Sequence, residues 1–294
     1  MRYMVQSLIK ASLWLLIASF IFSCSKDRIE ENKNSYESMD SYLDSKKQEE
    51  QIFNITKEGE CPITGKEGTK ICINKSMLTP SIDWPYTIKL VELLNPKEMV
   101  YYQHSNTNTL GLLTSDGEVR VFAEKELSSL TISPGAGWSV EFPNKKQIPQ
   151  MELFNGEGIN DAVNWGPSSA NYVTSSDYGY LGVHNTFGWV SVSKQVKMTS
   201  SPTATISFTS ETDELTNVIT YIYLPEKKCL IQVFDQISRQ IPVGETIKII
   251  MLAINSNGDF YTSTNEQVIS DNTTINVSLV HVTEQEMTII LDNL

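Results

Sequence analysis

Residues 117–125 read GEVRVFAEK, and residues 273–282 read TTINVSLVHV. In both stretches apolar and polar side chains alternate, which is the pattern of a β-strand with one buried face. Short β-rich runs of this kind recur between turn residues along the chain, as in WSVEFP at 138–143 and ETIKIIMLAI at 245–254. Helical periodicity is scarce. The sequence therefore predicts an all-β fold made of two β-sandwich-like domains.

Turn and helix signals refine this prediction. Asp116–Gly117 and Asn257–Gly258 are typical of hairpin turns. One short helix is expected at the C-terminus, where Thr283 can cap the helix and Glu286 can complete a capping box. The helix would turn one apolar face to the core, formed by Met287, Ile290, Leu291 and Leu294.

The start of the chain has the features of a lipoprotein signal peptide. Arg2 and Lys10 are followed by ASLWLLIASFIFS at 11–23, an apolar run shorter than the roughly 20 residues of a membrane-spanning helix. Ile21–Cys24 resembles a bacterial lipobox, which implies cleavage before Cys24 and lipidation of its thiol and amine. Several acyl chains would anchor the protein durably in the outer membrane. The alternative is an uncleaved signal anchor with an incidental cysteine.

Residues 24–52 are rich in charge and poor in aliphatic side chains, so the sequence predicts a flexible acidic tether that is disordered. Cleavage of residues 1–23 removes two bases and no acid, which moves the formal net charge from −12 to −14. A protein this acidic is a poor binder of nucleic acid. SKDRIEE at 25–31 also resembles the export signal of surface lipoproteins, the alternative being an ordinary linker. The folded body would thus face either the cell surface or the periplasm.

A change of composition near 164–182 suggests a boundary between a first β-sandwich domain at 53–167 and a second β domain, with the C-terminal helix, at 168–294. Cys61 and Cys72 flank a glycine-containing ribbon and are candidates for a disulfide in an oxidising envelope, or else two nearby thiols. Cys229, within a strand pattern, is expected to be a small core residue.

Three segments, in this order along the chain, carry a resemblance to a known group of proteins. They read ITGKEGTKI at 63–71, LLNPKEMVYYQHSNTNTLGLLTSDGEVRVFAEK at 93–125 and EFPNKKQIPQMELFNGEGINDAVNW at 141–165. They resemble lipoproteins of Bacteroidetes whose first domain is similar to the β-sandwich of zonula occludens proteins and netrin receptors. The resemblance implies a second β domain with a Gly-Trp-x-Asn-x-Asp signature. This chain has Gly188–Trp189 there, but Ser191 and Ser193 replace the Asn and Asp.

The residues of catalytic chemistry are sparse. The three histidines, His104, His184 and His281, stand alone in the sequence, so neither a metal site nor a catalytic triad is expected, and no cofactor is predicted. A pair of carboxylates from Glu152, Glu157 and Asp161 near Trp165 would be the one enzymatic possibility, a glycoside hydrolase. Against it, an acidic chain supplies such pairs by chance.

Binding is the stronger hypothesis. NYVTSSDYGY at 171–180 places Tyr172, Tyr178 and Tyr180 among small polar residues without a strand period, which is the composition of an adaptable recognition loop or of a plain linker. Trp165 is a further candidate stacking face. The tryptophans at 138 and 189 lie within strand patterns and are expected in the core.

The sequence therefore favours a non-catalytic outer-membrane lipoprotein with a binding or scaffolding role in the cell envelope or at the cell surface, attached to the membrane through its N-terminal lipid. Its protein or glycan partner is not readable. Two alternatives stay open, a carbohydrate-binding or glycoside-processing surface lipoprotein and a structural component of a motility or secretion assembly. Exposed apolar patches would favour the last.

Overall fold

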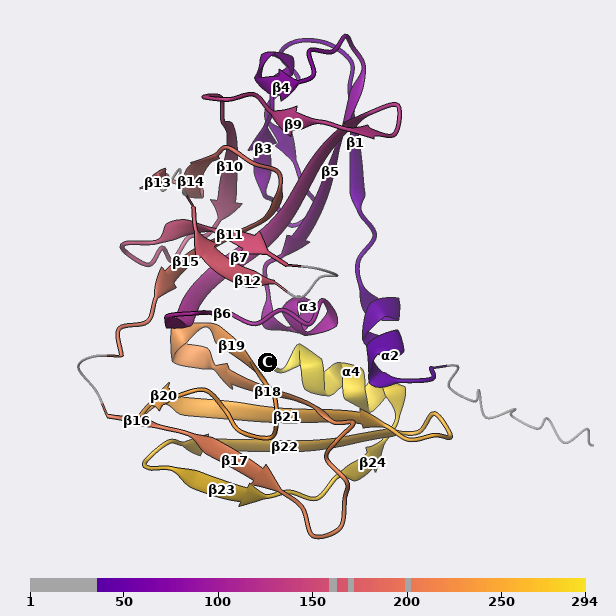
Figure 1. The fold of residues 1–294 in the computed structure, drawn as a ribbon, viewed down its shortest axis with the longest axis vertical. Helices are drawn as coiled ribbons and strands as arrows, with labels where there is room; N and C mark the ends of the chain where they lie inside the picture. The colour runs from indigo at the N-terminus through magenta and orange to yellow at the C-terminus, as the bar shows by residue number, and fades with distance from the viewer. Residues whose placement is uncertain (1–35, 159–162, 169–171, 199–201) are drawn as a thin grey trace, which may run out of the picture. The chain divides into compact units, whose positions relative to one another are not determined.

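Alternating apolar residues build a sandwich of two antiparallel sheets in the first part of the computed structural model, which describes residues 36–158, 163–168, 172–198 and 202–294 (Figure 1). The larger sheet has the strand order β1-β5-β7-β15-β11-β12, and β6 and β8 also pair with β7. Its strands are β1 (Gln51–Ile55), β5 (Tyr86–Leu93), β6 (Thr107–Asn108), β7 (Gly111–Lys125), β8 (Ser128–Ser129), β11 (Glu152–Glu157), β12 (Asn164–Pro167) and β15 (Gly188–Gln195).

The facing sheet has the order β13-β14-β10-β3-β2. Its strands are β2 (Ile63–Thr64), β3 (Lys70–Cys72), β10 (Trp138–Pro143), β13 (Tyr172–Ser175) and β14 (Gly179–His184). A separate pair, β4 (Leu78–Thr79) with β9 (Thr131–Ile132), extends one end. The inward residues of both sheets form one core, which includes Ile88, Val121, Trp138, Val140, Phe142 and Val190.

The second part of the chain repeats the arrangement with fewer paired strands. A five-stranded sheet, β19-β18-β21-β22-β24, is joined by two ribbons, the antiparallel β16–β20 and the parallel β17–β23. The strands are β16 (Thr203–Ala204), β17 (Ile206–Thr209), β18 (Ile219–Leu224), β19 (Cys229–Val233), β20 (Ile241–Pro242), β21 (Thr246–Ile254), β22 (Phe260–Val268), β23 (Thr273–Asn276) and β24 (Val280–Val282). A core that includes Phe208, Ile222, Ile231, Ile241 and Ile249 lies between them. The predicted all-β, sandwich-like class is confirmed.

Of the two hairpin turns predicted from local sequence, one forms and the other does not. Asn257–Gly258 turns the chain between β21 and β22, with Gly258 at φ 86°, as predicted. Asp116–Gly117 lies inside β7 instead of forming a hairpin turn. Pairing with β15 slips at this point, between Ser191 and Ser193, so the two residues occupy a β-bulge, and Gly117 has φ 141°.

The run at 273–282 alternates as a strand, but the structure divides it. Its first part, β23, pairs with β17, and its last part, β24, pairs with β22 in the five-stranded sheet. Between them the Val277 amide donates to the carbonyl of Thr209, and the side chain of Val277 is buried. The alternation therefore reflects one strand that changes sheets at a corner of the sandwich.

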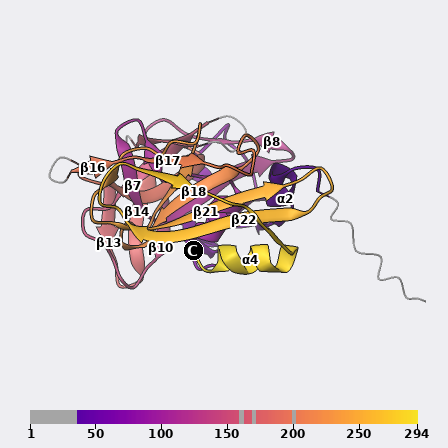
Figure 2. The ribbon, with the colours of Figure 1, turned by 90° about the horizontal axis from the view of Figure 1, so that it is seen from below.

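The C-terminal helix forms as expected. In α4 (Glu284–Asp292), the Thr283 side chain accepts from the amide of Glu286, and the Glu286 carboxylate accepts in return from the amide of Thr283. Met287 and Leu291 are buried. Figure 2 shows α4 running alongside the β21–β22 pair. Three short helices lie elsewhere in the described chain, α3 (Pro96–Tyr101), η1 (Lys75–Met77) and η2 (Pro225–Lys227).

The predicted flexible tether at 24–52 is too long at its C-terminal end. Residues 39–46 form a helix, α2 (Met39–Lys46), that Ser38 caps, and residues 51–55 form β1. Tyr42 and Leu43 are completely buried, and the Lys46 ammonium pairs with Glu284 of α4 at 2.6 Å. These buried side chains offset the weak helical pattern of the segment. Residues 24–35, with Cys24, lie outside the described residues.

Strand pairing also moves the boundary expected at 167/168. The strands β13, β14 and β15 follow that boundary in sequence, yet they pair with β10, β7 and β11 of the first sandwich. The pairing changes partners only between Gln195 and Thr203. Residues 36–294 form one compact unit, because a third core contains side chains of both parts, among them Leu93, Trp165, Trp189, Tyr221, Leu252 and Phe260.

Hydrogen bonds connect the first part of the chain to strand β19 of the second part. The amide of Asn106 donates to the carbonyl of Leu230 in β19, and the Leu230 amide donates to the Asn106 side chain. The Asn106 side chain in turn donates to Glu118, which also contacts His104 at 2.5 Å. The outer edge of β19 is therefore occupied by residues of the first part.

A fully buried carboxylate organises one loop of the first sandwich. Glu92 accepts hydrogen bonds from the amides of Glu67 and Thr69, at 3.0 and 2.8 Å, and from the side chain of Gln51 at 2.8 Å. A Cβ atom on Gly65 would lie 2.3 Å from this carboxylate, so only glycine fits. The loop between β2 and β3 is thus built around Glu92.

Candidate functional site

The aromatic residues predicted to bind a partner are mostly internal. Trp165 is 1% exposed in β12, and its indole N–H donates to the carbonyl of Ser105 at 3.0 Å. Tyr180 is 2% exposed, and its hydroxyl donates to Asp116 in the β7 bulge at 2.5 Å. Neither ring offers a face to a ligand, so both predictions are wrong. Each side chain is a satisfied polar aromatic of the core.

In the predicted recognition loop at 171–180, the described residues 172–180 belong to a β-hairpin. Tyr172 lies in β13, where its side chain is outside the description, and β13 pairs with β14. Tyr178 is half-buried at the turn; its hydroxyl donates to Gly68, and the ammonium of Lys70 lies 3.4 Å from the ring centroid. This tyrosine therefore ties the hairpin to the β2–β3 loop. Cross-strand pairing of β13 and β14 overrides the loop-like composition.

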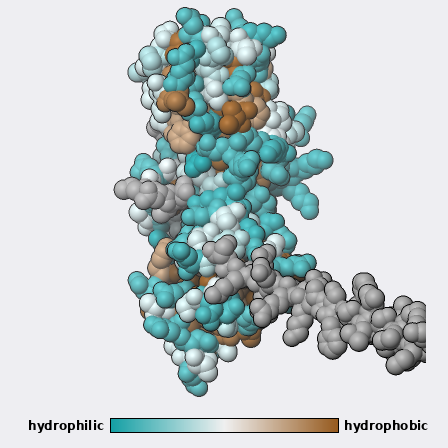
Figure 3. Space-filling model, turned by 90° about the vertical axis from the view of Figure 1, so that its right-hand side faces the viewer, coloured by the Kyte–Doolittle hydropathy of each residue, from teal (hydrophilic) through white to brown (hydrophobic). Residues whose placement is uncertain are grey.

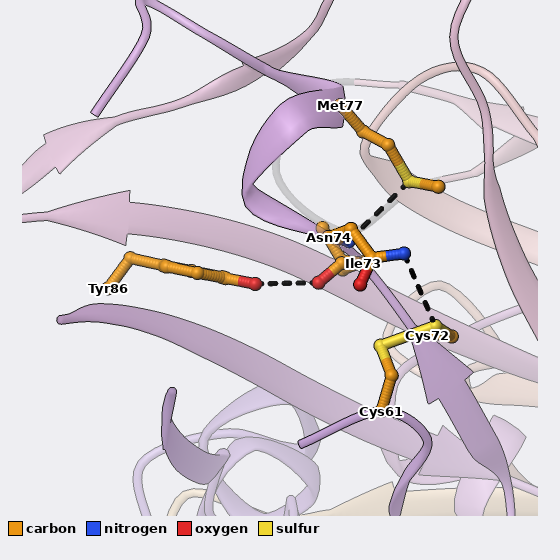
Figure 4. Close-up of a disulfide and its surroundings, with 6 residues drawn as sticks. All are labelled: Cys61, Cys72, Ile73, Asn74, Met77 and Tyr86. Carbon is orange, nitrogen blue, oxygen red and sulfur yellow. Dashed lines mark hydrogen bonds between the residues drawn. A yellow bond between two sulfur atoms is a disulfide. The ribbon is translucent and has the colours of Figure 1, made fainter. Parts of the chain in front are cut away.

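Cys61 and Cys72 form a disulfide, with their Cα atoms 4.9 Å apart (Figure 4). The bond joins the segment before β2 to the end of β3. Nearby, the hydroxyl of Tyr86 donates to the carbonyl of Ile73 at 2.6 Å. Cys229 is buried in the core of the second part, as predicted, and burial raises the pKa of its thiol to about 12. A thiol of that pKa is a poor nucleophile at neutral pH.

The candidate carboxylates do not converge on a tryptophan. Glu152 and Glu157 are exposed on β11, whereas Trp165 is buried, and Asp161 lies outside the described residues. Five of the cavities in the described part of the chain, of about 320 to 530 Å³, have no tryptophan in their walls. The arrangement gives no support to glycoside hydrolysis.

Two of the three histidines are buried structural residues. His104 contacts Glu118 and stacks edge-on against Trp189, 4.4 Å between ring centroids. His184 is bonded to Asn155, and burial lowers the pKa of its imidazole. His281 is exposed on β24. Among the residues that the structure describes, no three His, Cys, Asp or Glu side chains are arranged to hold a metal ion.

Three of the cavities adjoin one another beside the five-stranded sheet of the second part, with residues 37–40 and Gln103 also in their walls, and form what we call the acid-lined groove. The first cavity, about 320 Å³, and the second, about 530 Å³, share Asp40, Thr216, Val218 and Ile219. The second and the third, about 440 Å³, share Asn217, Val218, Ile254 and Asn255. The groove therefore follows the loop between β17 and β18 and passes the N-terminus of α2.

The walls of the groove carry charge of one sign. Their acidic residues are Glu37, Asp40, Asp213, Glu214 and Asp235, and no lysine or arginine lines any of the three cavities. Asp213 accepts from the amide of Leu279 and from the hydroxyl of Thr212, and these hydrogen bonds lower the pKa of its carboxyl. That carboxylate is therefore charged at neutral pH. Apolar side chains, including Val218, Ile219 and Ile254, lie between the acids.

A turn with exposed apolar side chains ends the groove. Phe234 is 68% exposed and Ile237 is 56% exposed, and the two face each other across an antiparallel bridge. The turn residues between them, Asp235 and Gln236, both have positive φ, 53° and 62°. Such turns normally carry Asn-Gly, because a left-handed conformation costs a residue with a side chain about 1–2 kcal/mol. Both apolar side chains are therefore open to solvent at this turn.

Sequence reasoning did not find the groove. Its walls come from 37–40, 213–220 and 232–236, with residues of β21 and β22, and no local pattern links these segments. The one visible signal is the acidic loop ETDELTN at 211–217. A second exposed apolar turn exists in the first sandwich, where Leu127 is 92% exposed with φ 68°. The face drawn in Figure 3 is largely hydrophilic, with separated hydrophobic patches.

No family model matches the chain, and searches of curated proteins and of solved structures find no match. None of the helices that the structure describes is long and apolar enough to cross a membrane.

Proposed function

We propose that this protein is a non-catalytic lipoprotein of the bacterial outer membrane that holds a protein partner in the acid-lined groove. The observation that carries the binding role is the exposed Phe234 at the end of that groove, with the exposed Ile237 bridged to it across the turn. Exposed apolar residues beside a groove are a typical feature of interaction surfaces. The Ile21–Cys24 motif supports the proposed location in the outer membrane, since it has the position and the residue types of a lipidation site.

A scaffolding role within a larger assembly is the second candidate. Leu127, on the turn between β7 and β8, is a second exposed apolar residue held at positive φ, and it belongs to the first sandwich. Two such turns in different sandwiches would let one molecule contact two partners. A glycan-binding role has less support, because Trp165 is buried and Tyr180 is bonded internally.

The proposal is tested by expressing the full chain, a Cys24→Ala variant and a Phe234→Ser/Ile237→Ser variant with a C-terminal tag. Membrane fractionation should recover the full chain and the groove variant with the outer membrane and release Cys24→Ala. Chemical crosslinking of intact cells should give a discrete adduct that the groove variant loses. A membrane-bound Cys24→Ala protein would contradict the anchor, and an adduct that survives in the groove variant would contradict the binding role. Protease shaving of the same cells separates a surface location from a periplasmic one.

A further inference from the structure

We infer that the acid-lined groove binds an extended polypeptide segment in which basic and apolar side chains alternate, an inference that rests on the proposed function and specifies its partner. The shape of the groove is the first argument. The three cavities are contiguous, because the second shares four wall residues with each of the other two and Val218 lines all three. A series of adjoining sites fits a chain that is laid along it better than one compact small molecule.

Charge is the second argument. Five acids line the groove without a compensating lysine or arginine in its walls, and four of them, Glu37, Asp40, Glu214 and Asp235, are exposed. Complementary charge steers association and excludes partners of like charge. Nucleic acid and anionic lipid would be repelled, whereas lysine and arginine side chains would be attracted.

The alternation follows from how the two kinds of wall residue are placed. Val218, Ile219 and Ile254 are half-buried between the exposed acids. In an extended segment, successive side chains point to opposite sides. One set of side chains can therefore cover the apolar residues while the other set reaches the carboxylates. Phe234 and Ile237 supply additional apolar contact at one end.

The carboxylates are placed to keep their charge available. Within the described part of the chain, Asp235 and Glu37 make no hydrogen bond to another side chain and no ion pair, whereas Asp40 accepts from Gln103 at 3.1 Å. Asparagine tolerates the left-handed conformation that residue 235 adopts. Glu37→Gln and Asp235→Asn therefore remove two charges with little expected change to the fold.

The test uses the full-length protein in detergent and a fluorescent peptide of about ten residues in which lysine and valine alternate. Fluorescence anisotropy should show binding that weakens at least about 3-fold in the Glu37→Gln/Asp235→Asn variant, and by about 5-fold or more in Phe234→Ala. High salt should also weaken binding of the peptide to the unaltered protein, because salt screens the attraction between lysine and the groove carboxylates. Asp83→Asn/Glu126→Gln, which removes two exposed charges from the first sandwich, is the matched control and should bind as the unaltered protein does.

Two more peptides decide the chemistry. A glutamate–valine peptide should not bind, and a lysine–serine peptide should bind more weakly than lysine–valine and be insensitive to Phe234→Ala. Equal binding of all three peptides, or equal loss in the control variant, would overturn the inference. Failure of the lysine–valine peptide, combined with a crosslinked adduct in cells that Phe234→Ser/Ile237→Ser removes, would overturn this partner chemistry and leave the proposed function standing.

Discussion

The two sandwiches of this molecule use their acidic residues in opposite ways. In the first, three carboxylates are internal: Glu92 accepts from two backbone amides, Glu118 contacts His104 and Asn106, and Asp116 accepts from Tyr180. In the second, acids such as Glu214 and Asp235 stand on the rim of an open groove. Acidic residues thus serve folding in the first sandwich, whereas those of the groove are open to solvent.

The sharpest way to break this comparison is to remove the carboxylate at the centre of the first sandwich. Glu92→Ala leaves the amides of Glu67 and Thr69 and the side chain of Gln51 without their acceptor. Each unsatisfied buried donor costs about 1–3 kcal/mol, so we expect a loss of roughly 3 kcal/mol or more in the free energy of unfolding. Urea denaturation measures it. Glu214→Gln, on the groove, is the control and should change stability by less than about 0.5 kcal/mol.

The disulfide marks a second contrast, because Cys61 and Cys72 close a loop only in the first sandwich. Replacing both residues by serine should lower the free energy of unfolding by about 3 kcal/mol, since the open loop gains conformational entropy in the unfolded chain. Thermal unfolding with and without a reductant checks this. A midpoint that reductant does not change in the unaltered protein would show that the bond contributes nothing.

The C-terminal helix gives a pH-dependent prediction in the second part. Hydrogen bonds from the amide and hydroxyl of Thr283 lower the pKa of Glu286 in the folded protein. Glu286 is therefore a stabilising group above its unfolded pKa of about 4.3, and that contribution is lost as the pH falls through the lower folded value. Thr283→Ala should cost about 1 kcal/mol at neutral pH.

Measuring the unfolding of Thr283→Ala against the unaltered protein from neutral pH down to about pH 3 checks the direction. The difference should shrink as the pH falls. A difference that grows toward acid would contradict the capping-box account of this helix.

The smallest effect on stability is expected at the groove. Phe234→Ser and Ile237→Ser remove side chains that are more than half exposed, so the free energy of unfolding should change by less than about 0.5 kcal/mol each. Urea denaturation of each variant and of Glu92→Ala under the same conditions compares their losses in the free energy of unfolding. A large loss here would mean that the two residues belong to the fold and are not held for a partner.

Sequence patterns predicted features that depend on near neighbours. The capping box at Thr283 and the turn at Asn257–Gly258 are set by residues three or fewer positions apart, and both form. The pair Asp116–Gly117 carries the same local signal, but pairing of β7 with β15 across more than seventy residues makes it a bulge. Local preference decides only where no long-range pairing competes with it.

Burial of particular side chains was the harder problem. The segment at 39–46 is polar overall. Its three buried residues, Met39, Tyr42 and Leu43, stabilise the helix only through contacts with elements far along the chain. The tyrosines at 178 and 180 likewise find partners in Gly68 and Asp116, which no spacing reveals. The groove is assembled from distant segments for the same reason, so composition alone directed attention to the wrong aromatic residues.

The central claim is that the second sandwich, and not the first, receives the partner. Site-specific photo-crosslinking in intact cells tests it most directly, with a photoreactive residue placed at Gln236, which is exposed on the groove turn, or at Thr174, which is exposed on β13. The account predicts a discrete adduct from position 236 and none from position 174. An adduct from 174 alone, or the same adduct from both positions, would contradict it.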